Sequence, residues 1–309
     1  MSSSETAAAA KPALQKPEFI YSGGAIRPWD EAMLHVASEG VQRGMNVFEG
    51  LKGFWQTDGR FGLLAMPRHY ARMKRSALLM HMPFEMSFTE FDTACHSIAA
   101  CQYKPTHNMW IRATLYITEG HWGQGDKTDL VLTAYNHHLG PPPRMTTGVS
   151  TWRRASDNAL PARIKTGFNY LAARLAKIEG RARGYSEMIL LNEAGRVAEF
   201  IGSGLLMVRD GVVYSPPPAE SAFESITVEI LRELCADLGT SFVMRPIKRT
   251  ELLIADELAS VGTLNDLVVI SAIDERPMGD APVLEALLGK YLAAANGTNP
   301  HSAVDLTIR

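Results

Sequence analysis

Several features that would place the chain in a specialised class are scarce or absent. Its 309 residues include three cysteines, Cys95, Cys101 and Cys235, whose spacing fits neither a disulfide framework nor a metal motif. No run of about 18 apolar residues occurs, which argues against a membrane span. The net charge is −2 with both signs intermixed, so no basic patch indicates nucleic acid or an anionic membrane as a partner. We therefore expect a cytoplasmic protein with reduced thiols and without a metal site.

The first residues also lack targeting features. Residues 1–16 are rich in serine and alanine, without the apolar core of a signal peptide or the arginines of a transit peptide. We interpret them as a loose tail that precedes the folded chain.

The rest of the sequence has the composition of a folded α/β protein. Hydrophobic residues make up 46% of the chain, and its length favours two domains that share a cleft. Helical and strand patterns are interspersed, which indicates a mixed α/β fold. The string PPPR at residues 141–144 can continue neither a helix nor a central strand, so it marks the expected linker. We predict a small N-terminal α/β domain (17–140), a linker (141–147) and a larger C-terminal domain (148–309).

Local patterns predict individual elements. The string TDG at residues 57–59 separates two apolar stretches and predicts a hairpin. Ser87 and Glu90 match a capping box, which opens a helix that runs to about Cys101. Helical spacing places Ile226 and Ile230 on one face of a later helix, together with Leu234 and Leu238. Further helices are expected at residues 68–81 and 169–183, and strands at residues 109–117, 130–135 and 148–152.

Lys165 is the residue on which the functional interpretation depends. It lies at the end of an irregular stretch, directly before an expected helix, in the string ARIKTGFNY at residues 162–170. Covalent chemistry with carbonyl compounds needs an amine that is sometimes neutral, and a nearby positive charge such as Arg163 favours the neutral form. Taken alone, Lys165 would be read as a solvated loop lysine.

Five short motifs occur in one order along the chain. They are VFEGL (47–51), HxxR (69–72), KxGxNY (165–170), GxVxE (195–199) and SIT (225–227). In this order and approximate spacing they resemble the branched-chain aminotransferase family, which comprises class IV aminotransferases of fold type IV. The resemblance covers residues 21–274. It implies a C-terminal pseudo-barrel domain and pyridoxal 5'-phosphate as the cofactor.

The resemblance also implies roles on the cofactor side. Lys165 would hold the cofactor as a Schiff base, and Tyr170 would hydrogen-bond its phenolic oxygen. Glu199 would face the ring nitrogen and keep it protonated, which strengthens the electron sink. Arg72 would hold the phosphate, because its charged fork suits that group.

Further phosphate contacts are implied at two turns. Ile226 and Thr227 open a helix, whose free N–H groups and dipole attract anions. Thr263 lies in the string GTL at residues 262–264, which resembles the family's turn that offers N–H groups to the phosphate and to the substrate carboxylate.

The substrate side matches less well. Phe48 and Arg112 match residues that the family places at the substrate pocket. Arg43 and Trp110 stand where two tyrosines are usual, and Leu264 replaces a smaller alanine. We expect these five residues to bind the substrate, with Arg43 as a receptor for a carboxylate. The string NHHL at residues 136–139 also departs, with His137 and His138 in place of aromatic rings.

Taken together, the motifs predict a transaminase that exchanges an amino group between an amino donor and a 2-keto acid by a ping-pong mechanism. The resemblance also implies a homodimer in which residues 119–123 of one chain close the other chain's cleft. Three alternatives stay open: a lyase of the aminodeoxychorismate type, a transaminase for D-amino acids or simple amines, and a cofactor-binding protein without turnover.

Overall fold

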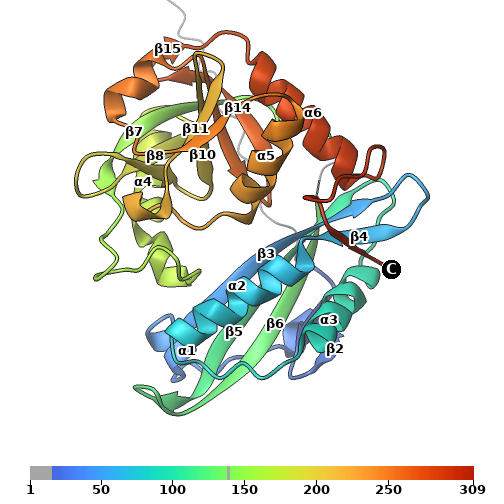
Figure 1. Ribbon diagram of the computed structural model, residues 1–309. Coiled ribbons are helices and arrows are strands. Elements are labelled where there is room, and N and C mark those ends of the chain that lie inside the picture. The colour runs from blue at the N-terminus through green and yellow to red at the C-terminus, as the bar shows by residue number, and fades with distance from the viewer. Residues whose placement is uncertain (1–15, 138–139) are drawn as a thin grey trace, which may run out of the picture.

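The chain folds into two lobes, which lie one above the other in Figure 1. This computed structural model describes residues 16–137 and 140–309. One lobe is built on a seven-stranded sheet and the other on a nine-stranded sheet, with helices packed against both. The expected mixed α/β fold of two domains is confirmed. The predicted tail, apart from Lys16, and His138 lie outside the described residues.

The N-terminal lobe is an antiparallel sheet in which a short hairpin joins the two longest strands, β5 and β6. Its strand order is β16-β4-β3-β5-β6-β1-β2. Its elements are β1 (Phe19–Ser22), β2 (Ala25–Pro28), η1 (Trp29–Glu31), α1 (Glu39–Gln42), β3 (Asn46–Trp55), β4 (Phe61–Leu64), α2 (Met66–Leu79), α3 (Phe88–Ala100), β5 (Asn108–His121) and β6 (Gln124–His137).

Several sequence predictions are confirmed in this lobe. The strands β3 and β4 form the expected hairpin, although β3 begins at Asn46 rather than at Leu51. The capping box is complete, since Ser87 Oγ accepts from the Glu90 N–H and the Glu90 carboxylate accepts from the Ser87 N–H. The helix predicted at residues 68–81 is α2.

The C-terminal lobe has a mixed sheet, in which β7 is parallel to both of its neighbours, β14 and β8. The strand order is β12-β11-β10-β13-β14-β7-β8-β9, and β15 pairs with β14. Its elements are β7 (Met145–Arg153), η2 (Gly167–Tyr170), α4 (Leu171–Ala182), β8 (Glu187–Leu191), β9 (Val197–Phe200), β10 (Gly204–Arg209), β11 (Val212–Ser215), η3 (Pro218–Glu220), α5 (Ile226–Asp237), β12 (Phe242–Met244), η4 (Arg249–Ile254), β13 (Glu257–Gly262), β14 (Asp266–Ile273), β15 (Arg276–Pro277) and α6 (Pro282–Ala295).

The connections between the lobes differ in detail from the prediction. The strand β7 starts at Met145, so the last part of the predicted linker at 141–147 is already paired with β14. The chain also returns to the first lobe at its end, because β16 (Leu306–Ile308) pairs with β4 beside the C-terminus in Figure 1. The limits of the two domains therefore stay a prediction.

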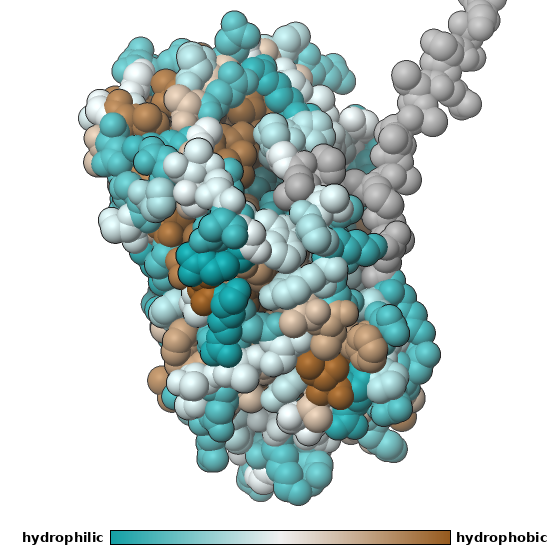
Figure 2. All heavy atoms as spheres, turned by 90° about the vertical axis from the view of Figure 1, so that its right-hand side faces the viewer, coloured by the Kyte–Doolittle hydropathy of each residue, from teal (hydrophilic) through white to brown (hydrophobic). Residues whose placement is uncertain are grey.

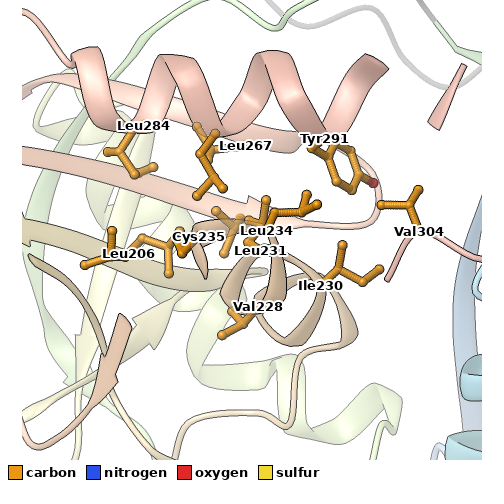
Figure 3. Packing of buried hydrophobic residues seen from close by; sticks show 14 of the residues in the cluster. Leu206, Val228, Ile230, Leu231, Leu234, Cys235, Leu267, Leu284, Tyr291 and Val304 are labelled. Carbon is orange, nitrogen blue, oxygen red and sulfur yellow. The ribbon is translucent and has the colours of Figure 1, made fainter. Parts of the chain in front are cut away.

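Helix α5 lies at the centre of the largest apolar cluster. Leu231 and Leu234 pack beneath α6, which contributes Leu284 and Tyr291, and Leu267 of β14 completes the contact (Figure 3). The predicted helical face is confirmed for three of its four residues. Leu238 is the exception, because it caps the helix and is 38% exposed. This packing fixes the direction of α5 and hence the place where its N-terminus points.

The surface carries polar and apolar residues in mixture. Hydrophilic residues predominate on the face drawn in Figure 2, and apolar ones form separate groups. Two of the cysteines, Cys95 and Cys235, are buried, whereas Cys101 is exposed at the end of α3. Within the described residues, no helix has the length and apolar character that crossing a membrane requires.

Candidate active site

A cavity of about 430 Å³ lies between the two lobes. Both sheets contribute to its walls, together with the irregular stretch before η2 and the N-terminus of α5. A cavity of this size is typical of small-molecule sites. The predicted site residues that line it are Phe48, Arg72, Trp110, Arg112, Lys165, Tyr170, Glu199, Ile226, Thr263 and Leu264.

Lys165 reaches into this cavity from a backbone held at both ends. Its carbonyl accepts from the Phe48 N–H at 2.8 Å, and its N–H donates to Ser76 Oγ at 3.2 Å. The Nζ atom donates to the Tyr170 hydroxyl at 3.3 Å. It also lies 4.3 Å from the ring centre of Phe223 and 5.1 Å from that of Phe48. The amine is therefore surrounded by aromatic rings and one hydroxyl, and it is available for covalent chemistry.

Glu199, on β9, is a buried carboxylate at another wall of the cavity. Arg154 Nε lies 3.1 Å from Oε1, and the Phe223 N–H donates to Oε2 at 3.0 Å. Burial raises the pKa of Glu199 above its usual range, although Arg154, the Phe223 N–H and Lys165 oppose this effect. The carboxyl group is thus poised to accept a proton or to pair with a cationic ring nitrogen.

Arg72, on α2, is held by a buried carboxylate. Its Nε and Nη2 atoms both donate to Glu49 at 2.7 Å, and Nη1 donates to the Glu224 carbonyl at 2.8 Å. His69 Nδ1 lies 2.7 Å from the same carboxylate. A guanidinium has five N–H donors, so this arrangement leaves two of them for a ligand. The motif HxxR and the glutamate of VFEGL are therefore one hydrogen-bonded unit.

The N-terminus of α5 adds further donors near Arg72. Ser225 caps the helix by accepting from the Val228 N–H at 3.3 Å. Among the described residues, none accepts a hydrogen bond from the N–H groups of Ile226 and Thr227. Ile226 lines the cavity, whereas the Thr227 side chain is buried outside it. Two free N–H groups at a helix start, close to an arginine, form a site for an anion such as phosphate.

The wall formed by β3 and β5 is aromatic and carries one cation. Trp110 stacks on Tyr135 with ring centres 5.6 Å apart, and Gly50 allows its indole to lie against β3. The Arg112 guanidinium lies 4.0 Å from the ring centre of Phe48. Within the described part of the chain, no residue forms an ion pair or hydrogen bond with this guanidinium. Arg112 is thus available for an anionic ligand, whereas Arg72 already has a carboxylate partner.

Arg43 does not line the cavity. Its guanidinium pairs with Glu39 at 3.1 Å and lies 4.7 Å from the ring centre of Trp122. The buried Glu39 also accepts from the Trp122 N–H, so Arg43 helps to hold the hairpin between β5 and β6. Arg163 is likewise turned away, because it pairs with Asp157 and is half-exposed. The positive charge that the sequence suggested near Lys165 does not come from Arg163.

Four residues that line the cavity or support its side chains were not predicted as site residues from the sequence. Arg154 and Phe223 are brought to Glu199 by chain segments far from it in sequence, and no local motif marks them. Glu49 and Gly50 lie inside the string VFEGL, so the motif contained the signal although their roles were not visible. Sequence spacing could not show which of these side chains face the cavity.

Comparison with known families assigns the site. The family model for amino-transferase class IV matches residues 46–273, which is most of the chain. The chain belongs to the class IV aminotransferases. The predicted family and fold type are confirmed, and as a class IV aminotransferase the chain is a transaminase that uses pyridoxal 5'-phosphate.

Similar proteins span the same length as this aminotransferase. The branched-chain-amino-acid aminotransferase of Salmonella typhimurium is 28% identical over 275 residues, which are 86% of this chain and 88% of that protein. A solved branched-chain aminotransferase from Thermoproteus uzoniensis has a TM-score of 0.88 at 27% identity, and covers 94% of this chain and 98% of its own. The Escherichia coli enzyme gives a TM-score of 0.86 at 26% identity, with 92% and 97% covered.

Proposed function

We propose that this aminotransferase moves an amino group between an amino acid and a 2-keto acid in two half-reactions. The observation that carries the proposal is the position of Lys165, whose amine lies in the cavity between the Tyr170 hydroxyl and the Phe223 ring. A transaminase needs an amine at that place that can both hold the cofactor and move a proton.

The cavity fits pyridoxal 5'-phosphate. Arg72 and the free N–H groups at the start of α5 would hold the phosphate, and the buried carboxylate of Glu199 would hold the ring nitrogen. When bound, the cofactor supplies an aldehyde that exchanges amino groups and a protonated ring that withdraws electrons. Glu199 favours the protonated ring because the two groups carry opposite charges in a buried site.

Residues of the chain itself would transfer the proton and hold the reacting groups in place. The Lys165 amine would remove a proton from the substrate carbon that carries nitrogen, and would return one during the reverse half-reaction. Tyr170 orients that amine through its hydroxyl group. Arg154 holds the Glu199 carboxylate in place and favours its charged form.

We propose an apolar amino acid with a free carboxylate as the donor. Arg112 supplies the cation for the carboxylate, and Trp110 with Leu264 forms an apolar wall that differs from the expected tyrosine and alanine. Another solved branched-chain aminotransferase, 28% identical to this chain with a TM-score of 0.87, has been crystallised with 4-methylvaleric acid, a carboxylate with a branched apolar chain. The similarity of the chains supports a related donor with an altered pocket.

A single-donor experiment tests the function. The cofactor-loaded enzyme, mixed with one amino acid and no acceptor, should lose the visible absorbance of the bound cofactor and release one equivalent of keto acid. Lys165→Ala should do neither, because it lacks the amine. Lys74→Ala, an exposed lysine on α2, is the matched control and should behave as the wild type does. Pyruvate released from an amino-chorismate substrate would instead select the lyase.

The substrate cation is tested by a matched pair of arginine variants. Arg112→Met should raise KM for carboxylate-bearing donors by roughly ten- to hundredfold, because a charge-assisted hydrogen bond is lost. Arg43→Met should leave the preference for carboxylate-bearing donors over carboxylate-free amines unchanged, because its guanidinium is already paired with Glu39. An amine donor without a carboxylate should be much less affected by Arg112→Met. Equal effects of the two variants on both donors would contradict the assignment.

We also propose a homodimer in the cytoplasm. Trp122, at the tip of the hairpin between β5 and β6, is 72% exposed, and Met33 and Val36 are exposed apolar residues as well. In the proposed dimer, the hairpin tip at residues 119–123 of one chain would close the active-site cleft of the other chain. Light scattering at assay concentration tests this, and a fully active monomer would contradict it.

A further inference from the structure

Lys52 is a buried lysine that the proposed reaction does not use. It lies on β3, and its side chain is 2% exposed. Its Nζ atom donates to Asp266 Oδ2 at 2.5 Å and to the Leu264 carbonyl at 3.2 Å. These partners belong to the other lobe, more than 200 residues later in the chain. The ammonium group therefore ties the turn between β13 and β14 to the N-terminal sheet.

That turn forms part of the cavity wall. It runs from Gly262 to Asp266, which face each other at the end of the β13–β14 hairpin. Thr263 and Leu264 line the cavity, and no described residue accepts a hydrogen bond from their N–H groups. Asp266 has a left-handed backbone with φ +57°, a conformation that Asp and Asn adopt more readily than other non-glycine residues. Lys52 contacts this residue through its carboxyl group.

The register of β3 places the turn at the substrate end of the cavity. Lys52 pairs with Trp110 across the sheet, and Gly50 pairs with Arg112. Side chains two residues apart on a strand share one face, so Gly50 and Lys52 face the same side as Phe48. The turn that Lys52 holds is thus next to the wall that carries the free cation Arg112.

An ion pair at this place is a poor means of stabilising the fold. Both partners are almost fully buried, so their attraction is offset by the loss of hydration. The Tyr291 hydroxyl adjoins the carboxyl group of Asp266, and burial raises the pKa of both groups. A buried pair that adds little net stability is better explained by the geometry that it imposes on the turn.

We propose that Lys52 is a positioning residue for the substrate carboxylate: by fixing the Leu264 carbonyl and Asp266, it keeps the turn and its two free N–H groups at the end of the cavity where Arg112 lies. This rests on the proposed function, because it assumes that a carboxylate occupies that end. Lys52 acts through the turn and does not touch the substrate. The N–H groups and the Arg112 guanidinium would bind the carboxylate together.

The probe is 4-methylvaleric acid, a carboxylate without an amino group. Its dissociation constant is measured on the cofactor-loaded enzyme from the change in cofactor absorbance, and the thermal midpoint of each variant is measured in parallel. Lys52→Met should weaken binding of the probe by about tenfold or more, as expected for a misplaced donor pair. Lys52→Arg, which keeps the charge and the donors, should recover most of the affinity.

The affinity for pyridoxal 5'-phosphate, measured by quenching of tryptophan fluorescence, should change much less than that for the probe. Asp266→Asn tests the other end of the pair, and suits the left-handed backbone because asparagine tolerates it. Asp266→Asn should also weaken binding of the probe. This second variant keeps the proposal testable if Lys52→Met fails to fold. Wild-type affinity for the probe in folded Lys52→Met, or in Asp266→Asn, would overturn the proposal. Failure of the wild type itself to bind the probe would count against the proposed function instead.

Discussion

Replacing Glu49 by glutamine should expose how much the motif VFEGL contributes to the phosphate end of the site. Glu49 is fully buried and accepts hydrogen bonds from two nitrogens of Arg72, while His69 lies within 2.7 Å. Burial alone would raise the pKa of Glu49, but Arg72 and His69 outweigh it and lower this pKa from 4.5 to about 2. The ionised form is therefore the one that the fold stabilises.

The expected magnitude follows from this shift. A change of about 2.5 pKa units corresponds to roughly 3 kcal/mol of free energy of unfolding, at about 1.4 kcal/mol for each unit. Glu49→Gln keeps the shape of the side chain and removes the charge, so Arg72 is left buried without its anion. We expect a loss of stability of about 3 kcal/mol at neutral pH, within the range measured when one partner of a buried pair is removed.

The sign of the pH dependence is also determined. Because the folded pKa lies below the unfolded one, the contribution of Glu49 is complete above about pH 4.5 and is lost as the pH falls toward 2. In a His69→Gln background, urea unfolding should show a difference between chains with and without Glu49→Gln that is constant from pH 7 to about 5. At about pH 3.5 this difference should be smaller by roughly 1.4 kcal/mol.

A second buried group has to be separated from this effect. Burial lowers the pKa of His69, so its contribution to stability is present above about pH 6.5 and is lost as the pH falls below that value. This change occurs at higher pH than that of Glu49, and His69→Gln should remove it. A difference between wild type and Glu49→Gln below about 1 kcal/mol at pH 7, or one that does not change on acidification, would refute the reasoning.

Two further predictions concern the cavity. Glu199→Gln should lower kcat strongly with the cofactor still bound, and should leave the cofactor-free chain at least as stable at neutral pH. Because the pKa of Glu199 is raised in the folded state, its ionisation destabilises the chain as the pH rises. The free energy of unfolding of the cofactor-free variant should therefore be equal to or higher than that of the wild type, while kcat falls. A drop in both quantities would contradict this. Gly50→Ala should displace Trp110, because the added Cβ would lie 3.0 Å from the indole Nε1. This displacement should raise KM for the amino donor. The increase in KM should largely disappear in a Trp110→Phe background.

The sequence alone determined the elements and the family, because both depend on information that is local. The capping box at Ser87, the hairpin of β3 and β4, and the apolar face of α5 follow from residue spacing over one or two turns. The five motifs, taken in order, were enough to mark Lys165 and the cavity around it. Such patterns can be recognised in a single sequence because each reflects a requirement of the nearby backbone.

The tertiary structure decided which charges are free to act. Arg43 and Arg112 were both candidates for a carboxylate, and only their partners separate them: Glu39 neutralises the first, whereas the second faces the cavity unpaired among the described residues. The partners of Glu199 and Lys52 likewise come from distant segments. Whether a charge is paired depends on contacts between residues remote in sequence, and a single sequence holds no local pattern for such contacts.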